Sequence, residues 1–595
     1  MKIFFAFLFI ITFECSAQST LNPEITSAEL KERINYLASD NLQGRFTGSA
    51  GADSAANFIK TLFESYGLKS FNGSYFQEFP FVASLELTKD NSLDIKLSGK
   101  KSSLQLKKEY IPCPFTGSAS ANGQIAFAGY GISAPNLNYD DYAGLDVKGK
   151  IVMVMRYNPD GGNPHSQFEK YSSYRYKAKT AKDKGAAGII FVNGYNPKDD
   201  EDKLMQLVYD GAGGIDSLCA VQIKRSVADK IFGADNLDLK KTQHLIDSTK
   251  LPHSFLFNNA NVSINTGIKE VIKYGKNVVG FLEGDNPSLR DQYLVIGAHY
   301  DHLGWGETGS LYRGTEPKIH YGADDNASGA AGILELAENF SSLKGKLKRS
   351  IIFISFSGEE IGALGSSYFV EHPPIPLSEM TVMINLDMIG RLDKENDLTV
   401  YGTGTSSIWK GLLNEINAKK AFNLKMNDEG YAPSDQSSFY AKKIPVLFFF
   451  TGTHTDYHRP SDTPDKINYP GEESILNFVF TIAQQLDTLS VKPDYINVPR
   501  KDSGKITAFR VYVGTVPDYS GQVDGLKING VNEGSPAQKG GLQGGDIIIG
   551  FGGKKISNIY DYTYALGDYS PGDIVEVIVL RSGQKLNLKV ELGAR

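Results

Sequence analysis

Four short apolar runs in the second half of the chain predict buried strands. They are residues 292–298 (QYLVIGA), 349–357 (RSIIFISFS), 381–386 (TVMINL) and 443–450 (KIPVLFFF). Short runs rich in β-branched and aromatic residues favour strands over helices. Asn326 or Ser328 can cap a helix that continues through residues 332–336. We therefore expect an α/β domain with a mixed, mostly parallel sheet flanked by helices.

Each predicted strand leads into side chains that can bind a metal ion. The first run is followed by His299, the second by Glu359 and Glu360, the third by Asp387, and the loop after the fourth ends at His458. Open α/β sheets place their sites outside the carboxyl ends of parallel strands. If these four strands are parallel, their polar side chains belong to one site.

A further carboxylate, Asp325, lies at the predicted helix start, within residues 322–329 (GADDNASG). Imidazole and carboxylate groups are ligands for divalent metals. A single Asp after a strand is more often a turn or cap residue, and a single His is more often solvated. Five such residues, each at a strand exit or helix start, favour a metal site over five unrelated surface residues.

The motifs around these residues resemble those of a known family. HxD near GADDNASG, then GEE, LDMIG and YHRPSDT, resembles the co-catalytic di-zinc aminopeptidases, which include aminopeptidase Y and are related to glutamate carboxypeptidase II and the transferrin receptor. The resemblance implies an enzyme that hydrolyses peptide bonds at free N-termini with two Zn²⁺ ions. Peptides are the implied substrates.

The resemblance also implies roles for individual residues. The metal ligands would be Asp325, which would bridge both zinc ions, with His299 and Asp387 on one ion and Glu360 and His458 on the other. Glu359 would be the general base, and Asp301 would hold the ring of His299. Tyr457 matches a tyrosine that stabilises the oxyanion in relatives, and an ordinary buried aromatic is an equally good interpretation.

Other interpretations of the same residues stay open. A carboxypeptidase or a one-zinc glutaminyl cyclase on this fold is compatible with the ligand set, whereas a metal-free receptor would not need it. Gln436 stands where relatives often have His, which concerns substrate preference and not the metal ligands. His302 and His454 lie near predicted ligands, and we interpret them as supporting or solvated residues.

The chain divides into several predicted segments. They are a signal peptide (1–17), an amino-terminal part of the peptidase domain (18–104), an inserted protease-associated domain (105–265), the zinc peptidase domain proper (266–490) and a PDZ domain (505–595). The signal is a basic residue followed by a short apolar stretch, which predicts export to the periplasm or the extracellular space. No later run is long enough for a membrane span, so none is expected in the mature protein.

The two accessory domains are identified by resemblance. AAGIIF, within residues 186–191, is typical of the protease-associated α/β domain, and GSPAQKGGLQGGDII, at 534–548, resembles the signature of the mainly-β PDZ domain. Residues 525–528 would form the PDZ strand beside which a peptide C-terminus binds. A C-terminal peptide is therefore a possible partner, and a docking role is the alternative.

Net charge and cysteine content bear on the partners and on a disulfide. The net charge of −6, from 62 basic and 68 acidic residues, includes no basic stretch and argues against nucleic acid as a partner. After removal of the signal, Cys113 and Cys219 remain. Export permits a disulfide between them, and two buried free thiols are equally compatible with the sequence.

Overall fold

The computed structural model describes residues 21–594 except 162, 164–165, 196–201, 216, 313, 420–421, 499–510, 518–522, 532–533, 558, 567–568 and 570. The predicted signal segment lies outside the described residues. Among the helices described, none combines the length and the apolar character needed to cross a membrane.

An eight-stranded mixed sheet forms the centre of the predicted peptidase domain. In spatial order its strands are β1 (Phe76–Leu87), β12 (Ile268–Leu282), β14 (Ser350–Phe356), β13 (Tyr293–His299), β15 (Met380–Leu386), β18 (Val446–Phe450), β16 (Asp397–Tyr401) and β17 (Asn423–Asn427). The four strands predicted from apolar runs, β14, β13, β15 and β18, are neighbours and run parallel. The prediction of a mostly parallel central sheet flanked by helices is confirmed.

Helices cover both faces of this sheet because its strands bury side chains on both faces. On one face lie α1 (Ser27–Leu37), α2 (Ala50–Ser65), α6 (Gly329–Ser341), α8 (Trp409–Asn417) and α10 (Tyr469–Thr488). On the other lie α7 (Leu364–Glu371) and α9 (Gln436–Ala441). In β13, Leu294 and Ile296 join the first core and Val295 joins the second, which is the alternation a strand imposes.

A second eight-stranded sheet forms the inserted domain. Its order is β3 (Lys100–Ser103), β2 (Ser92–Leu97), β11 (Ser254–Thr266), β5 (Ala119–Ala128), β8 (Ile151–Met155), β9 (Gly188–Val192), β10 (Cys219–Ile223) and β4 (Tyr110–Pro112). Its helices are α3 (Tyr174–Asp183), α4 (Arg225–Ala234) and α5 (Leu239–Thr249). Because β2 and β3 pair within this sheet, it begins earlier in the chain than the expected boundary at residue 104.

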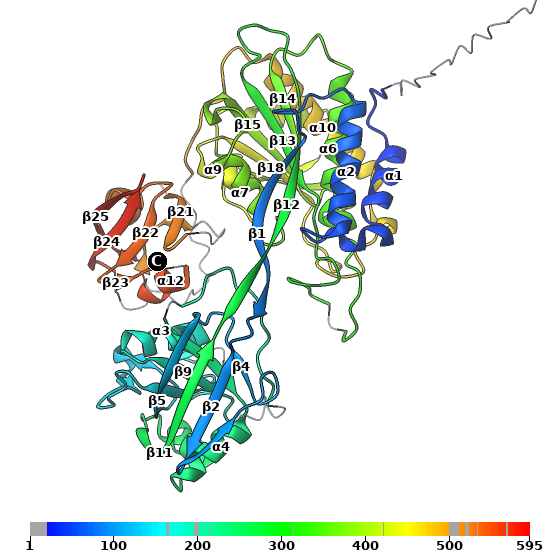
Figure 1. Cartoon of the computed structure of the whole chain (residues 1–595). Coiled ribbons are helices and arrows are strands. Elements are labelled where there is room, and N and C mark those ends of the chain that lie inside the picture. The colour runs from blue at the N-terminus through cyan, green and yellow to red at the C-terminus, as the bar shows by residue number, and fades with distance from the viewer. Residues whose placement is uncertain are drawn as a thin grey trace, which may run out of the picture.

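A long two-stranded ribbon joins the two domains. β1 pairs with β12 along most of its length, and β11 continues into β12 through Gly267. Figure 1 shows this ribbon running from the peptidase sheet to the inserted domain. Cys113 and Cys219 are both buried free thiols in the inserted domain, so the disulfide alternative is not observed.

The carboxyl-terminal domain is a small β-rich unit. It contains β19 (Val511–Tyr512), β20 (Thr515–Pro517), β21 (Leu526–Val531), β22 (Ile547–Phe551), β23 (Lys554–Lys555), β24 (Ile574–Arg581), β25 (Gln584–Glu591) and β26 (Gly593–Ala594), with α11 (Pro536–Lys539) and α12 (Ile559–Leu566). Its helix α12 packs against α3 of the inserted domain, and β21 packs against α9 of the peptidase domain.

The binding of a peptide C-terminus beside residues 525–528 stays a prediction. β21, which includes residues 525–528 only in part, pairs with β20 on one side and with β22 on the other. β22 pairs with Leu526 and Lys527, whereas β20 pairs with the later residues Ile528, Gly530 and Val531. In the part of this sheet that the structure describes, β20 lies at the edge, and peptide addition there would be compatible with the pairing.

Candidate metal centre

The predicted ligands come together because of the parallel strands. β13 ends at His299, β14 leads through a short turn to Glu360, and β15 is followed directly by Asp387. The loop after β18 brings in His458, and Asp325 comes from the segment Ala323–Ser328 that precedes α6. All five lie at the carboxyl edge of the sheet.

One group of possible ligands contains His299, Asp325 and Asp387. Nε2 of His299 lies 3.5 Å from Oδ1 of Asp325 and 3.4 Å from Oδ1 of Asp387. The three residues are buried. Oδ2 of Asp387 accepts a hydrogen bond from Oγ of Ser434 at 2.7 Å, whereas its Oδ1 is buried without a partner among the described residues. The orphaned oxygen therefore faces His299 and is available to a cation.

A second group contains Asp325, Glu360 and two imidazoles. Nε2 of His458 lies 3.3 Å from Oδ2 of Asp325 and 3.2 Å from Oε2 of Glu360. Nδ1 of His302 lies 2.6 Å from the other oxygen of Glu360, Oε1. Asp325 thus presents Oδ1 to the first group and Oδ2 to the second.

These donor sets fit zinc. Each of two sets, His299 with Asp325 and Asp387, and His302 with Asp325 and Glu360, has its ligand atoms within 4.8 Å of one another. Nitrogen and carboxylate oxygen are ligands that Zn²⁺ accepts. Three of the predicted ligands, Asp325, Glu360 and Asp387, are acidic, and Glu359 adds a fourth carboxylate beside them. So much buried negative charge is stable only when it is neutralised.

The pKa shifts express the same excess of negative charge. Burial alone would lower the pKa of His458, but hydrogen bonds to Asp325 and Glu360 raise it to about 10. Burial, followed by the charge of Glu360, raises the pKa of Asp325 to about 6. Burial would also raise the pKa of Glu360, but His302 and His458 outweigh it and hold that pKa well below its ordinary value. Without a metal ion, protonated imidazoles balance the negative charge of the carboxylates. A bound cation would balance the same charge.

Glu359 points differently from its neighbour Glu360. Its Oε2 lies 4.0 Å from Nε2 of His299, and Glu360 faces the other histidines. Burial, and then the nearby carboxylates of Asp387 and Asp435, raise the pKa of Glu359 well above its ordinary value. A carboxylate with a raised pKa is a stronger base, and so a better proton acceptor, than a carboxylate with the ordinary pKa.

Asp301 makes different contacts from those the resemblance implied. Its Oδ1 is 3.8 Å from Nδ1 of His299, which instead lies 3.2 Å from the Asp301 backbone carbonyl. The carboxylate accepts hydrogen bonds from Oγ1 of Thr47 at 2.8 Å and from the backbone N–H of Glu359 at 3.2 Å. Asp301 therefore lies beside His299. It also holds the turn that carries Glu359, through the hydrogen bond from the Glu359 backbone.

Tyr457 is half-buried next to the second group. Its ring stacks on that of His458, with centroids 3.8 Å apart. Burial, together with the surrounding carboxylates, raises the pKa of its hydroxyl, so the group stays protonated and can donate a hydrogen bond. This arrangement is compatible with both interpretations of Tyr457.

Sequence reasoning missed three residues that support the site. Arg45 is fully buried and donates to the carbonyls of Tyr300 and Gly322, at 2.7 and 3.0 Å. Asp462 accepts from the backbone N–H groups of Asp324 and Asp325. Thr47 is the third, because its hydroxyl donates a hydrogen bond to the carboxylate of Asp301. Asp462 could have been found from its place in YHRPSDT, but nothing in the spacing of Arg45 or Thr47 points to a site so far along the chain.

The remaining histidines near the site differ in their surroundings. His302 is completely buried and bonded to Glu360, which makes it part of the site. His454 lies with Nε2 3.2 Å from Oδ2 of Asp324, the neighbour of a predicted ligand. His302 therefore contacts a predicted ligand, and His454 contacts the residue beside one.

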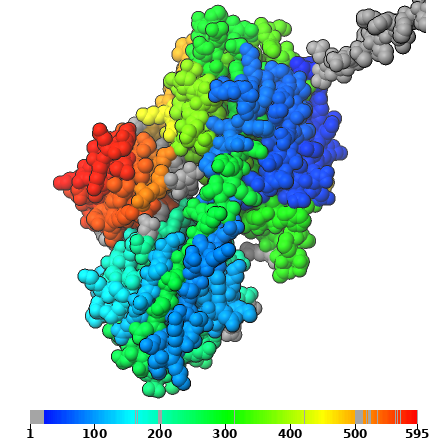
Figure 2. Space-filling model, viewed as in Figure 1, coloured from blue at the N-terminus to red at the C-terminus, as the bar shows by residue number. Residues whose placement is uncertain are grey.

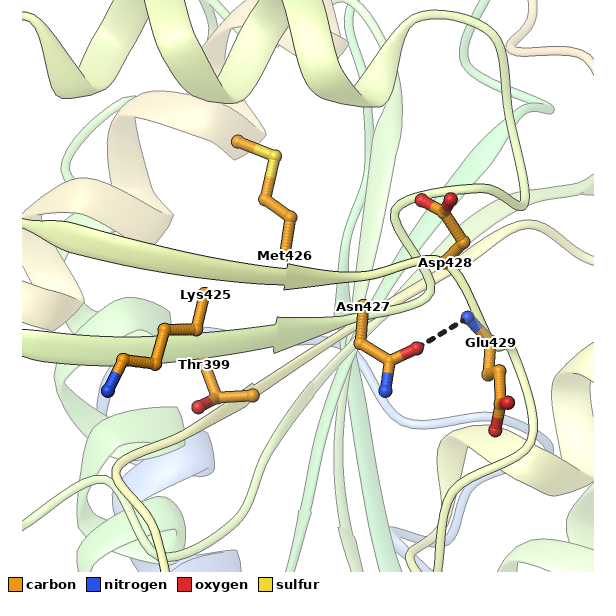
Figure 3. Close-up of a pocket in the computed structure, with 6 residues that line it drawn as sticks. All are labelled: Thr399, Lys425, Met426, Asn427, Asp428 and Glu429. Carbon is orange, nitrogen blue, oxygen red and sulfur yellow. Dashed lines mark hydrogen bonds between the residues drawn. The ribbon is translucent and has the colours of Figure 1, made fainter. Parts of the chain in front are cut away.

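A separate pocket of about 430 Å³ lies along the edge strands β16 and β17 (Figure 3). Its polar groups are already engaged: Lys425 pairs with Asp397, Oδ1 of Asp428 accepts from Thr403, and Oδ1 of Asn427 accepts from the backbone of Glu429. The predicted site residues lie elsewhere, so this pocket is not the reaction centre.

An α/β sheet with buried imidazoles and carboxylates at its carboxyl edge defines a metal-dependent hydrolase centre. Comparison with known protein families identifies which kind of hydrolase this is. Residues 277–483 match the model of peptidase family M28, residues 115–231 match the PA domain and residues 507–592 match the PDZ domain. Residues 277–483 therefore form an M28 peptidase domain, and the chain also carries a PA insert and a PDZ domain.

Individual relatives are distant. Aminopeptidase YwaD of Bacillus subtilis is 25% identical over 415 residues, which are 65% of this chain and 77% of that protein. The uncharacterized protein YfbL of Escherichia coli is 26% identical over 286 residues, which are 42% of this chain and 81% of that protein. The solved aminopeptidase from Aneurinibacillus sp. strain AM-1 has a TM-score of 0.47 at 22% identity, covering 82% of this chain and all of that one.

Proposed function

We propose that this protein is an exported zinc aminopeptidase that removes residues from the free N-termini of peptides with the help of two zinc ions. One observation carries the proposal. Asp325 of an M28 peptidase domain presents one carboxylate oxygen to His299 and the other to His458. A carboxylate placed in this way is suited to bridge two metal ions.

The chain's own residues would divide the work. His299 and Asp387 would hold one ion, Glu360 and His458 the other, and Asp325 both. Bound zinc supplies Lewis acidity that lowers the pKa of water and polarises the substrate carbonyl. Glu359 lies beside these ligands, with its backbone fixed by Asp301.

Glu359 would handle the proton. It would accept a proton from the attacking water and later donate it to the leaving amine, as a single carboxyl group can do in both directions. The raised pKa of Glu359 suits this exchange. Tyr457 would donate its hydroxyl proton in a hydrogen bond to the oxygen that becomes negatively charged, which its retained proton allows.

The preference for a free amine is supported by relatives. Several curated relatives carry the name aminopeptidase, including YwaD of Bacillus subtilis. The surroundings of the site are strongly acidic, which suits a substrate ammonium group better than a C-terminal carboxylate. Export is proposed from the basic and apolar start of the sequence.

Product analysis tests the proposal against its alternatives. The purified zinc-loaded protein is given a peptide of defined sequence, and released products are identified by mass spectrometry. An aminopeptidase releases the first residue, a carboxypeptidase the last, and a glutaminyl cyclase forms a ring from an N-terminal Gln without cleavage. Release of the last residue, or cyclisation without hydrolysis, would contradict the proposal. Zinc content near two per chain would support the metal count.

A further inference from the structure

A groove of about 1340 Å³ connects the metal centre with the other two domains. Glu360 lines it together with residues 80–84 of β1. Residues 207–214 of the PA domain and residues 523–527 of the PDZ domain line it as well. Figures 1 and 2 show these three domains meeting around the β1–β12 ribbon, with the PDZ domain in orange and red. Its volume exceeds that of a typical small-molecule pocket.

The PA wall of the groove is firmly held. The guanidinium of Arg175, on α3, binds both carboxylate oxygens of Asp210, at 2.6 and 2.7 Å. The same guanidinium donates to the backbone carbonyls of Ala212 and Gly213, at 2.8 and 3.0 Å. The bidentate pair, whose guanidinium is buried, and the two further hydrogen bonds fix a loop that has no helix or strand of its own. The loop is therefore a wall with a defined shape.

The PDZ wall is held from two sides. α12 packs against α3 of the PA domain, which is the helix that carries Arg175. Lys527 of β21 forms an ion pair with Glu371 at the end of α7 in the peptidase domain. The PDZ domain thus bridges the other two domains and closes one side of the groove.

The groove wall combines exposed apolar side chains with negative charge. Val208 is 58% exposed and Ile272 is 47% exposed, although both are aliphatic. Carboxylates of Glu270 and Glu307 also line it, as does that of Asp524, which pairs with Lys555. Among the lining residues that the structure describes, Lys527 is the basic one, and Glu371 neutralises it. Apolar and basic side chains would find contacts here, and acidic ones would be repelled.

The direction of the substrate follows from the reaction. An aminopeptidase places only one residue before the bond that it cleaves, so nearly all of a long peptide lies after that bond. A groove that leads away from Glu360 can therefore hold only the part of the peptide that becomes the leaving amine. Each residue of extended chain adds about 3.3–3.6 Å, so several residues are needed to reach from the metal centre across to another domain.

We infer that the groove between the PA and PDZ domains binds the part of a peptide substrate that follows the scissile bond, and that it selects long peptides with apolar and basic residues there. This inference rests on the proposed aminopeptidase function. It assigns Val208, Ile272 and Glu270 to substrate selection and gives the PDZ domain a place in the substrate cleft.

Apolar contact is tested with full-length variants Val208→Asn and Ile272→Asn. The matched controls are Leu251→Asn and Ile574→Asn, because these aliphatic residues are 62% and 68% exposed outside the groove. We measure the ratio of kcat/KM for a free-amine decapeptide to kcat/KM for leucyl-p-nitroanilide, which is too short to enter the groove. Loss of one aliphatic contact should lower this ratio by about 3- to 10-fold, mainly through KM, in the groove variants and not in the controls.

Charge is tested by Glu270→Lys with Glu576→Lys as the control on an exposed PDZ strand. Two decapeptides share an N-terminal leucine and carry either lysines or glutamates after the fourth residue. The wild-type protein should prefer the lysine peptide, and Glu270→Lys should reduce that preference by several-fold, more strongly at low ionic strength. Glu576→Lys should leave the preference as it is.

The two proposals fail in different ways. If the wild-type protein hydrolyses neither substrate, the proposed function is wrong, and the groove is then tested by fluorescence anisotropy with a labelled decapeptide. Unchanged ratios in every groove variant, or equal losses on both substrates, would overturn the inference. Equal affinities of the wild type and Ile272→Asn for the labelled decapeptide, measured by anisotropy, would also overturn the inference.

Discussion

Nδ1 of His302 lies 2.6 Å from Oε1 of Glu360, while Oε2 of the same carboxylate lies 3.2 Å from Nε2 of His458. One oxygen of Glu360 is thus held by a buried imidazole, and the other is directed at the second group of ligands. Partners that hold a ligand in this way tune metal affinity almost as strongly as the ligands do. His302 is therefore a positioning residue for Glu360.

Replacement of His302 should weaken one metal site selectively. In His302→Ala, the carboxylate of Glu360 loses the contact that orients it, and the affinity for one zinc ion should fall about 10- to 100-fold while the other is retained. Competition with a chromogenic chelator measures both affinities. His244→Ala, on helix α5, is the control for loss of an unrelated histidine. Two unchanged affinities would show that the bond to Glu360 has no effect on metal binding.

The two neighbouring glutamates should separate metal binding from proton transfer. Glu359→Gln keeps the shape of the side chain but cannot accept a proton, so it should retain zinc and lose activity by about 10²–10⁴-fold. Glu360→Gln replaces an anionic ligand with a neutral one and should lose zinc to a chelator more readily. Metal stoichiometry and kcat are measured for each variant.

The result also tests the assignment of the two roles. Loss of zinc in Glu359→Gln with full retention in Glu360→Gln would mean that the roles are exchanged. Full activity in both variants would place the reaction elsewhere.

Thr47 should influence catalysis from the other end of the chain. Its hydroxyl bonds to Asp301, which in turn accepts from the backbone N–H of Glu359. Thr47→Val removes one hydrogen bond of roughly 1 kcal/mol, which should lower kcat by about 5-fold or more with zinc content unchanged. Thr47→Ser, which restores the hydroxyl, should recover most of the activity. A loss of zinc, or no recovery with serine, would argue for a purely packing role.

Zinc should stabilise the folded protein. The ligand carboxylates are buried close together, so removal of the cations leaves their charge less well compensated. At free zinc 100-fold above the dissociation constant, each bound ion should add about 2.7 kcal/mol to the free energy of unfolding. Thermal unfolding with and without chelator measures this, with Asp325→Asn as the variant that should respond least. An identical melting temperature with and without zinc would contradict the metal assignment.

Much of the centre could be predicted because its ligands follow the ends of regular elements. His299 and Asp387 come directly after apolar strands, and the order of those strands in a parallel sheet fixes where their ends meet. The fold was predictable for the same reason, since parallel buried strands give uninterrupted apolar runs.

The parts that could not be predicted depend on contacts between distant segments. Arg45 and Thr47 come from a turn more than 200 residues before the ligands that they support, and their types and spacing carry no sign of it. The position of β21 inside its sheet depends on which strand becomes its neighbour, and the local PDZ motif does not encode that choice. The groove exists only because three domains meet, which no single motif describes.

The central claim is that zinc bound at Asp325 and its neighbours cleaves peptides from a free N-terminus. It is tested most directly by the rates at which the zinc-loaded full-length protein hydrolyses one peptide with a free amine and the same peptide acetylated. The account predicts rapid release of the first residue from the free peptide and at least a 100-fold slower reaction of the acetylated one, about 2.7 kcal/mol in transition-state free energy. Equal rates for the two peptides, or hydrolysis that persists after zinc is removed, would contradict it.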